Sequence, residues 1–400
     1  MDINQSLALL GGLSPALFMK RHWQKKPLLV RQAFAEFKPI ISRNALFKLA
    51  AQKTVESRLI VQAADQSWRM SHGPFSRGKL PTIDLPLWTL LVQGVNFHDE
   101  RADELLQNFR FLPDARLDDL MISFATEGGG VGPHFDSYDV FLLQASGERR
   151  WNISPQKSLM LRKNVQLKIL QNFQSEESFV LKAGDMLYLP PRYAHEGIAL
   201  SSSGENGCMT YSIGFQSPSE NQLSSQLLSK LADFQEDQLE ESALALKRIN
   251  NSFIYRDPQQ LATETPALIP QGLVDFAKQS IHKVLTDSNA LSMALGETLT
   301  ELKTQTDFEI QEFEWSASLI QSGHGCIYLD SRTRMLYDMQ YVFINGESWL
   351  AKGADAVFMN QLADQRFLDN QTLQTASKKA LLLLQSWYAE GWLHLKARKV

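Results

Sequence analysis

The first 217 residues contain a series of short apolar runs, most of them bounded by glycine, proline or asparagine. Short apolar runs between turn residues are typical of β-strands, whereas helices need longer stretches with a repeat of three to four residues. The runs lie at residues 28–30, 59–61, 88–92, 120–124, 138–144, 149–153, 186–189 and 209–215. Many short strands at this spacing favour a sandwich or jelly roll, the architecture that includes the cupins.

His134 and Asp136 stand two residues apart, between a Gly128-Gly129-Gly130 turn and the strand predicted at 138–144. Side chains alternate between the two faces of a strand, so these two point the same way and can bind one metal ion. His195 offers a third ligand, because the segment around it also looks like a strand, soon after the apolar run at 186–189. Two histidines and one carboxylate form the facial triad of non-haem Fe(II) oxygenases, which leaves positions open for a cosubstrate and O2. The sequence therefore predicts a metal centre of His134, Asp136 and His195.

Charge and cysteine content narrow the classes of partner and compartment. The net charge of −4 gives the chain no bulk affinity for nucleic acid, and its basic clusters at 20–26 and 396–399 are interpreted as solvated surface. The two cysteines, Cys208 and Cys326, form neither a disulfide framework nor a CxxC motif, which fits a reducing compartment. The chain shows no signal-peptide pattern, and its longest apolar run is far too short to cross a membrane. We therefore expect a cytoplasmic protein without membrane contact.

The residue pattern changes after Ser217, where apolar residues begin to recur at helical spacing. We predict a helical segment over residues 218–303, and we assign residues 1–217 to the β-rich domain. The apolar stripes exceed what one domain needs, so we expect this segment to form the interface of a homodimer. The residues of the stripes are Leu223, Leu227, Leu231, Phe234, Leu239, Leu246, Ile249, Leu273, Phe276, Ile281 and Val284.

Residues 304–400 mix helical and strand patterns. Asn345-Gly346 separates apolar runs at 341–344 and 348–350, which indicates a β-hairpin. Helical patterns follow near 355–365 and 372–390. Helices beside a hairpin favour a small winged-helix-like α+β domain. Because it has no basic recognition helix, we do not expect direct DNA binding.

Several longer stretches carry a resemblance to a known family. They are GGGVGPHFDSYDVFLLQASGERRW, GDMLYLPPRYAHEG, NGCMTYSIGF, FMKRHWQKKPLLVRQAF and RMSHGPF. With them, most of residues 15–217 resembles the JmjC/cupin ribosomal oxygenases, in particular the bacterial enzymes that hydroxylate an arginine of a large-subunit ribosomal protein. The resemblance implies a double-stranded β-helix (a cupin/JmjC jelly roll) that binds Fe(II), 2-oxoglutarate and O2. It also implies oxidation of 2-oxoglutarate to succinate and CO2, with hydroxylation of an unactivated carbon.

The distal carboxylate of 2-oxoglutarate needs a cation inside the barrel. Arg149 follows a tight turn at the start of a predicted strand and matches the position of the family's basic residue. The planar guanidinium of an arginine suits a carboxylate, and strand alternation points the neighbouring Arg150 the other way. We predict that Arg149 binds 2-oxoglutarate and that Ser123 donates a second hydrogen bond.

A substrate arginine that enters a partly apolar groove needs an acid or several acceptors, because burying its charge unpaired is costly. Asp119 and Met121 share one strand face; Asp119 is the candidate partner of the substrate cation. Met121 and Tyr138 would sandwich its aliphatic stem, and Ser212 would accept another N–H. A simple structural role at a strand end, or in the core, remains the alternative for Asp119 and Tyr138.

Other functions remain compatible with the same residues. The same chemistry applied to a histidine or an N-methyl-lysine of another protein is one alternative, because an acid at Asp119 favours any cationic target. A non-catalytic cupin scaffold and a zinc hydrolase are two others. Arg149 argues against a scaffold, which has no use for a buried cation opposite a metal.

Overall fold

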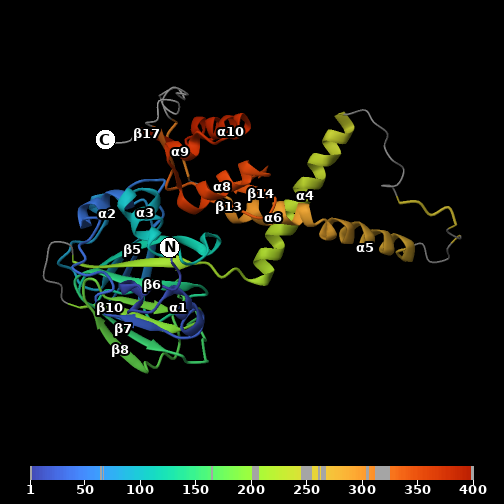
Figure 1. Ribbon diagram of the computed structural model, residues 1–400. Coiled ribbons are helices and arrows are strands. Elements are labelled where there is room, and N and C mark those ends of the chain that lie inside the picture. The colour runs from blue at the N-terminus through green and yellow to red at the C-terminus, as the bar shows by residue number, and fades with distance from the viewer. Residues whose placement is uncertain are drawn as a thin grey trace. The chain divides into compact units, whose positions relative to one another are not determined.

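The computed structural model describes residues 2–63, 65, 67–163, 165–200, 207–244, 255–259, 262, 267–302, 306–310 and 325–397. The chain forms two compact units, Met1–Ser217 and Pro218–Val400 (Figure 1).

The first unit consists mainly of antiparallel strands in two sheets. The larger sheet has the order β1-β9-β6-β11-β5-β4-β2-β3, and the smaller has the order β10-β7-β8. The strands are β1 (Leu28–Val30), β2 (Ser57–Gln62), β3 (Trp68–His72), β4 (Trp88–Val92), β5 (Leu117–Ala125), β6 (Asp139–Ser146), β7 (Arg149–Ser154), β8 (Glu177–Leu181), β9 (Met186–Leu189), β10 (Ala194–Ala199) and β11 (Cys208–Phe215).

The two faces of the larger sheet pack against different partners. Leu120 and Ile122 of β5 belong to a large core with residues from the N-terminal helices, such as Phe18 and Leu46. On the opposite face, residues of β6 and β9 pack against residues of β7 and β8 in a second core that includes Ile153. This second face is the interior of the barrel, and it carries the intervening residues of β5, among them Asp119 and Ser123.

The N-terminal helices begin at side chains that accept hydrogen bonds from their first turns. Ser14, Ser42 and Asp99 accept from the backbone N–H groups of Leu17, Ala45 and Arg101, the usual function of an N-cap residue. The helices are α1 (Pro15–Arg21), α2 (Arg43–Ala50) and α3 (Glu100–Gln107), with short 3-10 helices at Ala8–Leu10, Arg77–Lys79, Val95–Phe97 and Asp114–Arg116.

The second unit combines helices with two small antiparallel sheets, β16-β12-β17 and β13-β14-β15. Gly296 of α6 lies so close to β14 that a Cβ atom there would stand 2.3 Å from Phe343 Cδ1. The elements are α4 (Glu220–Leu244), α5 (Gln271–Thr286), α6 (Ser288–Thr300), α8 (Ala354–Gln365), α9 (Asn370–Leu373), α10 (Lys378–Ala389), β12 (Gly325–Leu329), β13 (Met335–Tyr337), β14 (Tyr341–Ile344), β15 (Glu347–Leu350), β16 (Phe367–Leu368) and β17 (Leu393–Ala397).

The predicted β-rich unit, followed by a helical segment and an α+β module, is confirmed. One predicted helix, 372–390, is instead divided into α9 and α10, because Ser377 caps a new helix by accepting from Ala380 N–H. The predicted stripe residues Leu246 and Ile249, and the boundary at 303/304, lie outside the described residues. In the part of the chain that is described, no helix is long and apolar enough to cross a membrane.

Candidate metal and cosubstrate site

A glycine-rich loop brings His134 next to β10. Backbone hydrogen bonds join His134 and His195 in both directions, at 2.9 and 2.8 Å. The loop packs so closely that a Cβ atom on Gly129 would lie 2.5 Å from the Trp88 carbonyl oxygen, and one on Gly130 equally close to that of Gly197. Glycine is therefore required at both positions, because a side chain on Gly129 would push the loop away from β4 and one on Gly130 would push it away from β10.

The three predicted metal ligands come together as expected. His134, Asp136 and His195 each offer one ligand atom, and these atoms lie within 4.8 Å of one another. His195 Nε2 is 3.5 Å from Asp136 Oδ2, and the two imidazole centroids are 4.2 Å apart. The Asp136 carbonyl oxygen accepts a 2.6 Å hydrogen bond from the backbone N–H of Arg192, which fixes the loop that carries the carboxylate.

The hydrogen bonds of both imidazoles determine which nitrogen is available to a metal. His134 Nδ1 lies 2.9 Å from the Gly132 carbonyl oxygen, and His195 Nδ1 lies 2.9 Å from that of Tyr193. A carbonyl oxygen only accepts, so each Nδ1 carries the proton and each Nε2 presents a lone pair. Burial, together with the nearby His134, lowers the pKa of His195 to about 4, which keeps it in the neutral form that binds metals.

Arg149 is buried in the barrel interior, at the start of β7. It is 4% exposed, and its Nε and Nη2 atoms are buried without a hydrogen-bond partner. Arg150 is exposed, as strand alternation predicts. The guanidinium carbon lies 5.8 Å from the centroid of the Trp151 ring. A buried cation with nitrogens that lack a hydrogen-bond acceptor is costly, so the site fits an anionic ligand that accepts from the guanidinium.

The register of β7 and β10 places Arg149 at a distance from the metal ligands that suits a short dicarboxylate. His195 is paired with Ile153, Gly197 with Trp151 and Ala199 with Arg149. His195 and Ala199 are therefore separated along the strand by roughly 13 Å, at about 3.3 Å per residue. Trp151 lies between the two ends, and its indole N–H is also buried without a partner.

Ser123 lies on the interior face of β5 and is buried. Its hydroxyl donates to the Thr210 carbonyl oxygen at 3.3 Å. To donate to a cosubstrate, this hydroxyl must rotate away from that carbonyl.

The residues predicted to bind the substrate lie on neighbouring interior positions. Asp119 and Met121 share one face of β5, and Met121 is paired with Ser212 of β11. The ring of Tyr138 would contact a Cβ atom on Gly214 of β11, at 3.8 Å. Burial, with the nearby carboxylates of Asp136 and Asp119, raises the pKa of Tyr138, so its hydroxyl stays protonated.

Two further polar residues near Asp119, Gln93 and Arg58, were not predicted from the sequence. Gln93 Nε2 donates to Asp119 Oδ1 at 3.1 Å, and Arg58 Nη2 donates to Gln93 Oε1 at 3.1 Å. Gln93 directly follows β4 and Arg58 lies on β2. The order β5-β4-β2 places both near Asp119, and no local motif indicates it.

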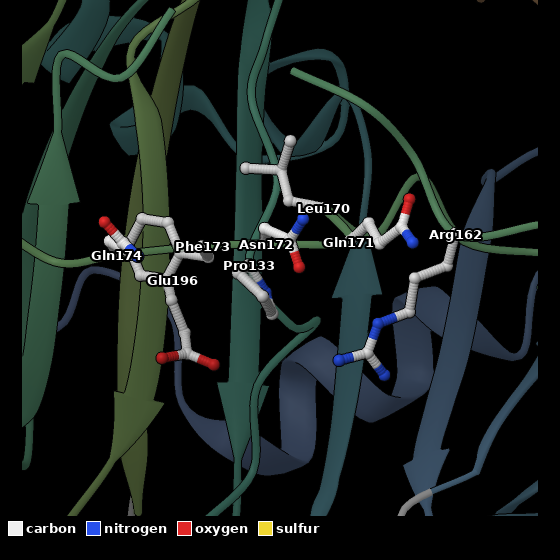
Figure 2. A pocket seen from close by; sticks show the side chains of 8 residues that line it. All are labelled: Pro133, Arg162, Leu170, Gln171, Asn172, Phe173, Gln174 and Glu196. Carbon is white, nitrogen blue, oxygen red and sulfur yellow. The ribbon is translucent and has the colours of Figure 1, made fainter. Parts of the chain in front are cut away.

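A surface pocket of about 530 Å³ lies beside the metal-binding strands but contains none of these residues (Figure 2). It is lined by Pro133 and Glu196, each adjacent in sequence to a metal ligand, and by residues of the 162–174 segment such as Arg162. Strand alternation points Glu196 away from the face that carries His195, so the pocket is separate from the barrel interior.

Comparisons with known proteins agree with this architecture. Sequence profiles match at residues 104–223 (JmjC domain) and at 283–394 (ROXA-like winged helix), the second of which includes α6. The ribosomal protein uL16 3-hydroxylase of Escherichia coli (strain K12) is 35% identical over 294 residues, which cover 72% of this chain and 72% of that protein.

Solved structures extend the similarity over almost the whole chain. The X-ray structure of E. coli YcfD has a TM-score of 0.80 at 29% identity and covers 96% of this chain and 98% of that chain. YcfD in complex with cobalt and 2-oxoglutarate has a TM-score of 0.77 at 30% identity, with the same coverage. The predicted jelly roll and winged-helix-like module are thereby confirmed, and the chain belongs to the JmjC-domain ribosomal oxygenase family.

Proposed function

We propose that this chain is an Fe(II)- and 2-oxoglutarate-dependent oxygenase that hydroxylates an arginine side chain of a large-subunit ribosomal protein. The observation that carries the proposal is the combination of a two-histidine, one-carboxylate cluster with a buried, unpartnered Arg149 further along the barrel interior. A metal-chelating dicarboxylate satisfies both features with one molecule. The uL16 hydroxylase among the relatives supports a ribosomal target.

Separate sets of residues would bind the metal, the cosubstrate and the substrate. His134, Asp136 and His195 would hold Fe(II), and Arg149 would bind the distal carboxylate of 2-oxoglutarate, with Ser123 as a secondary contact. When bound, the metal and 2-oxoglutarate supply the oxidising chemistry: one oxygen atom of O2 enters succinate as CO2 leaves, and the other enters a substrate C–H bond. The protein positions that carbon next to the metal and keeps other C–H bonds away from it.

The substrate side chain would enter between β5 and the segment that carries Tyr138. Asp119 would pair with the guanidinium, while Met121 and Tyr138 would hold its aliphatic stem. Ser212, paired with Met121 across the sheet, would accept another N–H. The neutral phenol of Tyr138 suits this role because its ring can pack on methylene groups while its hydroxyl stays hydrogen-bonded.

Asp119 would also pair with other cations, so an N-methyl-lysine or a histidine remains the second candidate target. Demethylation would release formaldehyde, whereas hydroxylation leaves one oxygen atom on the protein. A non-catalytic scaffold is disfavoured because an unpaired buried Arg149 would weaken its fold without serving a purpose.

We also propose that α5 contributes to a homodimer interface. None of its residues is buried, although apolar side chains recur along it. Leu273, Ile281 and Leu285 are 40%, 59% and 44% exposed. A helix that leaves such a stripe exposed in one copy of the chain is suited to pack on a second copy. A ribosomal substrate and two buried free cysteines, Cys208 and Cys326, are in keeping with a cytoplasmic protein.

Mass spectrometry of ribosomal proteins tests the proposal. The purified protein is incubated with Fe(II), 2-oxoglutarate, O2 and arginine-containing ribosomal peptides. We expect a gain of one oxygen atom on an arginine, absent for Asp136→Ala. Formaldehyde release without that gain would identify a demethylase, and turnover that does not depend on 2-oxoglutarate would identify a metal hydrolase instead.

A further inference from the structure

A chain of hydrogen bonds crosses three strands of the larger sheet and ends at Asp119. Arg58 Nη2 donates to Gln93 Oε1 at 3.1 Å, and Gln93 Nε2 donates to Asp119 Oδ1 at 3.1 Å. Arg58 lies on β2, Gln93 directly follows β4 and Asp119 lies on β5, and these strands are neighbours in the order β5-β4-β2. The sheet itself therefore sets the spacing of the three side chains.

The second oxygen of the same carboxylate is held by the backbone. Asp119 Oδ2 accepts from the Gly94 N–H at 2.8 Å, and the Asp119 residue is only 2% exposed. Gly94 has a left-handed backbone, with φ of 62°, and a Cβ atom there would lie 2.8 Å from Phe97 Cδ2. Each Asp119 oxygen thus accepts a hydrogen bond, which restricts rotation of the carboxylate about its terminal bond.

Arg58 determines which way the Gln93 amide faces. A guanidinium can only donate hydrogen bonds, so it requires the amide oxygen of Gln93 on its side. The amide NH2 group must then face Asp119, where it donates to the carboxylate. If Arg58 were absent, the amide could rotate and bring its oxygen towards Asp119, where two acceptors repel each other.

We propose that Gln93 and Arg58 are positioning residues that orient the Asp119 carboxylate towards the substrate cation. This inference rests on the proposed function, in which Asp119 pairs with the substrate guanidinium. Charge-assisted hydrogen bonds with two parallel contacts depend strongly on geometry. A freely rotating carboxylate would bind the cation less well and would let the target carbon drift from the metal, so that 2-oxoglutarate is consumed without hydroxylation.

A double-mutant cycle on the full-length protein tests this chain of hydrogen bonds from Arg58 through Gln93 to Asp119, which we call the Asp119 relay. Gln93→Met, Asp119→Asn and the double variant are compared with wild type in KM for an arginine-containing ribosomal peptide and in the ratio of succinate to hydroxyarginine. Gln62→Met, at the end of β2 and outside the relay, is the matched control. Calorimetric binding of 2-oxoglutarate to each Mn(II)-loaded variant and thermal unfolding report whether the cosubstrate site and the fold remain intact.

We expect Gln93→Met to raise the peptide KM about tenfold, the change equivalent to one hydrogen bond to a charged group, and to raise the succinate ratio. In the Asp119→Asn background, the same substitution should change KM less than about twofold. Arg58→Met should behave like Gln93→Met, whereas Arg58→Lys, which still only donates, should retain most of the wild-type KM. Affinity for 2-oxoglutarate should stay within about twofold throughout.

Independent effects of Gln93→Met and Asp119→Asn, which multiply in the double variant, would overturn the relay and leave the proposed function standing. So would an unchanged peptide KM in folded Gln93→Met. A wild-type protein that turns over 2-oxoglutarate but never modifies the arginine peptide would instead refute the arginine assignment, and the relay with it.

Discussion

Replacing Arg149 with methionine should separate cosubstrate binding from folding. Methionine retains the length and apolar character of the arginine stem but lacks the charge. Arg149 is 4% exposed, with two of its nitrogens buried and unpartnered in the ligand-free protein. We therefore expect the substitution to weaken 2-oxoglutarate binding strongly while leaving the ligand-free fold intact.

The size of the expected loss in 2-oxoglutarate affinity follows from the burial of Arg149. Removing one partner of a buried, hydrogen-bonded ion pair typically costs about 3–5 kcal/mol, which corresponds to a roughly 100-fold or greater rise in Kd. The ligand-free variant should unfold at about the same temperature as wild type or above it. The substitution removes a buried charge that has two nitrogens without a hydrogen-bond partner, although it also removes the contact of the guanidinium with the Trp151 ring, 5.8 Å from its centroid. Wild type should gain about 2.7 kcal/mol of stability at a ligand concentration of 100 times its Kd. The variant should gain almost none at that same concentration.

Calorimetry of 2-oxoglutarate binding to the Mn(II)-loaded protein, with thermal unfolding in the presence and absence of ligand, measures both effects. Arg150→Met is the matched control, because Arg150 is the exposed neighbour on the same strand. A Kd for Arg149→Met within about threefold of wild type would refute the assignment. A large loss of stability in the ligand-free variant would show that Arg149 supports the fold instead.

Four further predictions concern other parts of the molecule. Asp136→Ala should lower the Fe(II) content measured by metal analysis while leaving the circular dichroism spectrum unchanged. Asp119→Ala should impair peptide hydroxylation far more than uncoupled 2-oxoglutarate turnover, and equal losses would point to a structural role. Burial acts to raise the pKa of Asp330, but hydrogen bonds from Arg332 and His394 outweigh it and lower the pKa. This carboxylate therefore adds stability above its unfolded pKa that is lost as pH falls below about 4, and urea unfolding should show a shallower acid dependence for Asp330→Asn. Ile281→Glu should shift a dimer towards monomer in light scattering, and an unchanged mass would remove α5 from the interface.

The metal ligands were predictable because their geometry is local. His134 and Asp136 need only the two-residue repeat of an extended chain, and His195 follows an apolar run that ends at two prolines. The burial of Arg149 was predicted partly in this way: strand alternation separates it from Arg150, and the resemblance to the family's basic residue selected which of the two faces the interior. Features of this kind depend on residues close in sequence, so a single sequence contains them.

Arg58 and Gln93 could not be predicted, because their role depends on the order of strands in the sheet. They approach Asp119 only because β4 lies between β5 and β2, and no pattern within 57–62 or 88–92 specifies that neighbour. The strands β3 and β8 were missed for another reason: their sequences, WRMSH and ESFVL, lack a clear apolar alternation, and tertiary pairing supplies what local preference does not.

The barrel interior retains polar groups that the protein alone does not satisfy. Among the described residues of the first unit, Thr89, Arg149 and Trp151 each have buried polar atoms without a hydrogen-bond partner, and each such group costs about 1–3 kcal/mol. The residues of β10 that are paired with Trp151 and Arg149 are the small Gly197 and Ala199. A Cβ atom on Gly197 would lie 2.7 Å from the Trp151 ring, so only glycine allows the indole to pack there. Buried donors without a partner suit a ligand rich in acceptors, so the same side chains affect both the stability of the free protein and its affinity for a dicarboxylate. Variants selected for greater stability without ligand should therefore arise at these positions, and they should lose cosubstrate binding.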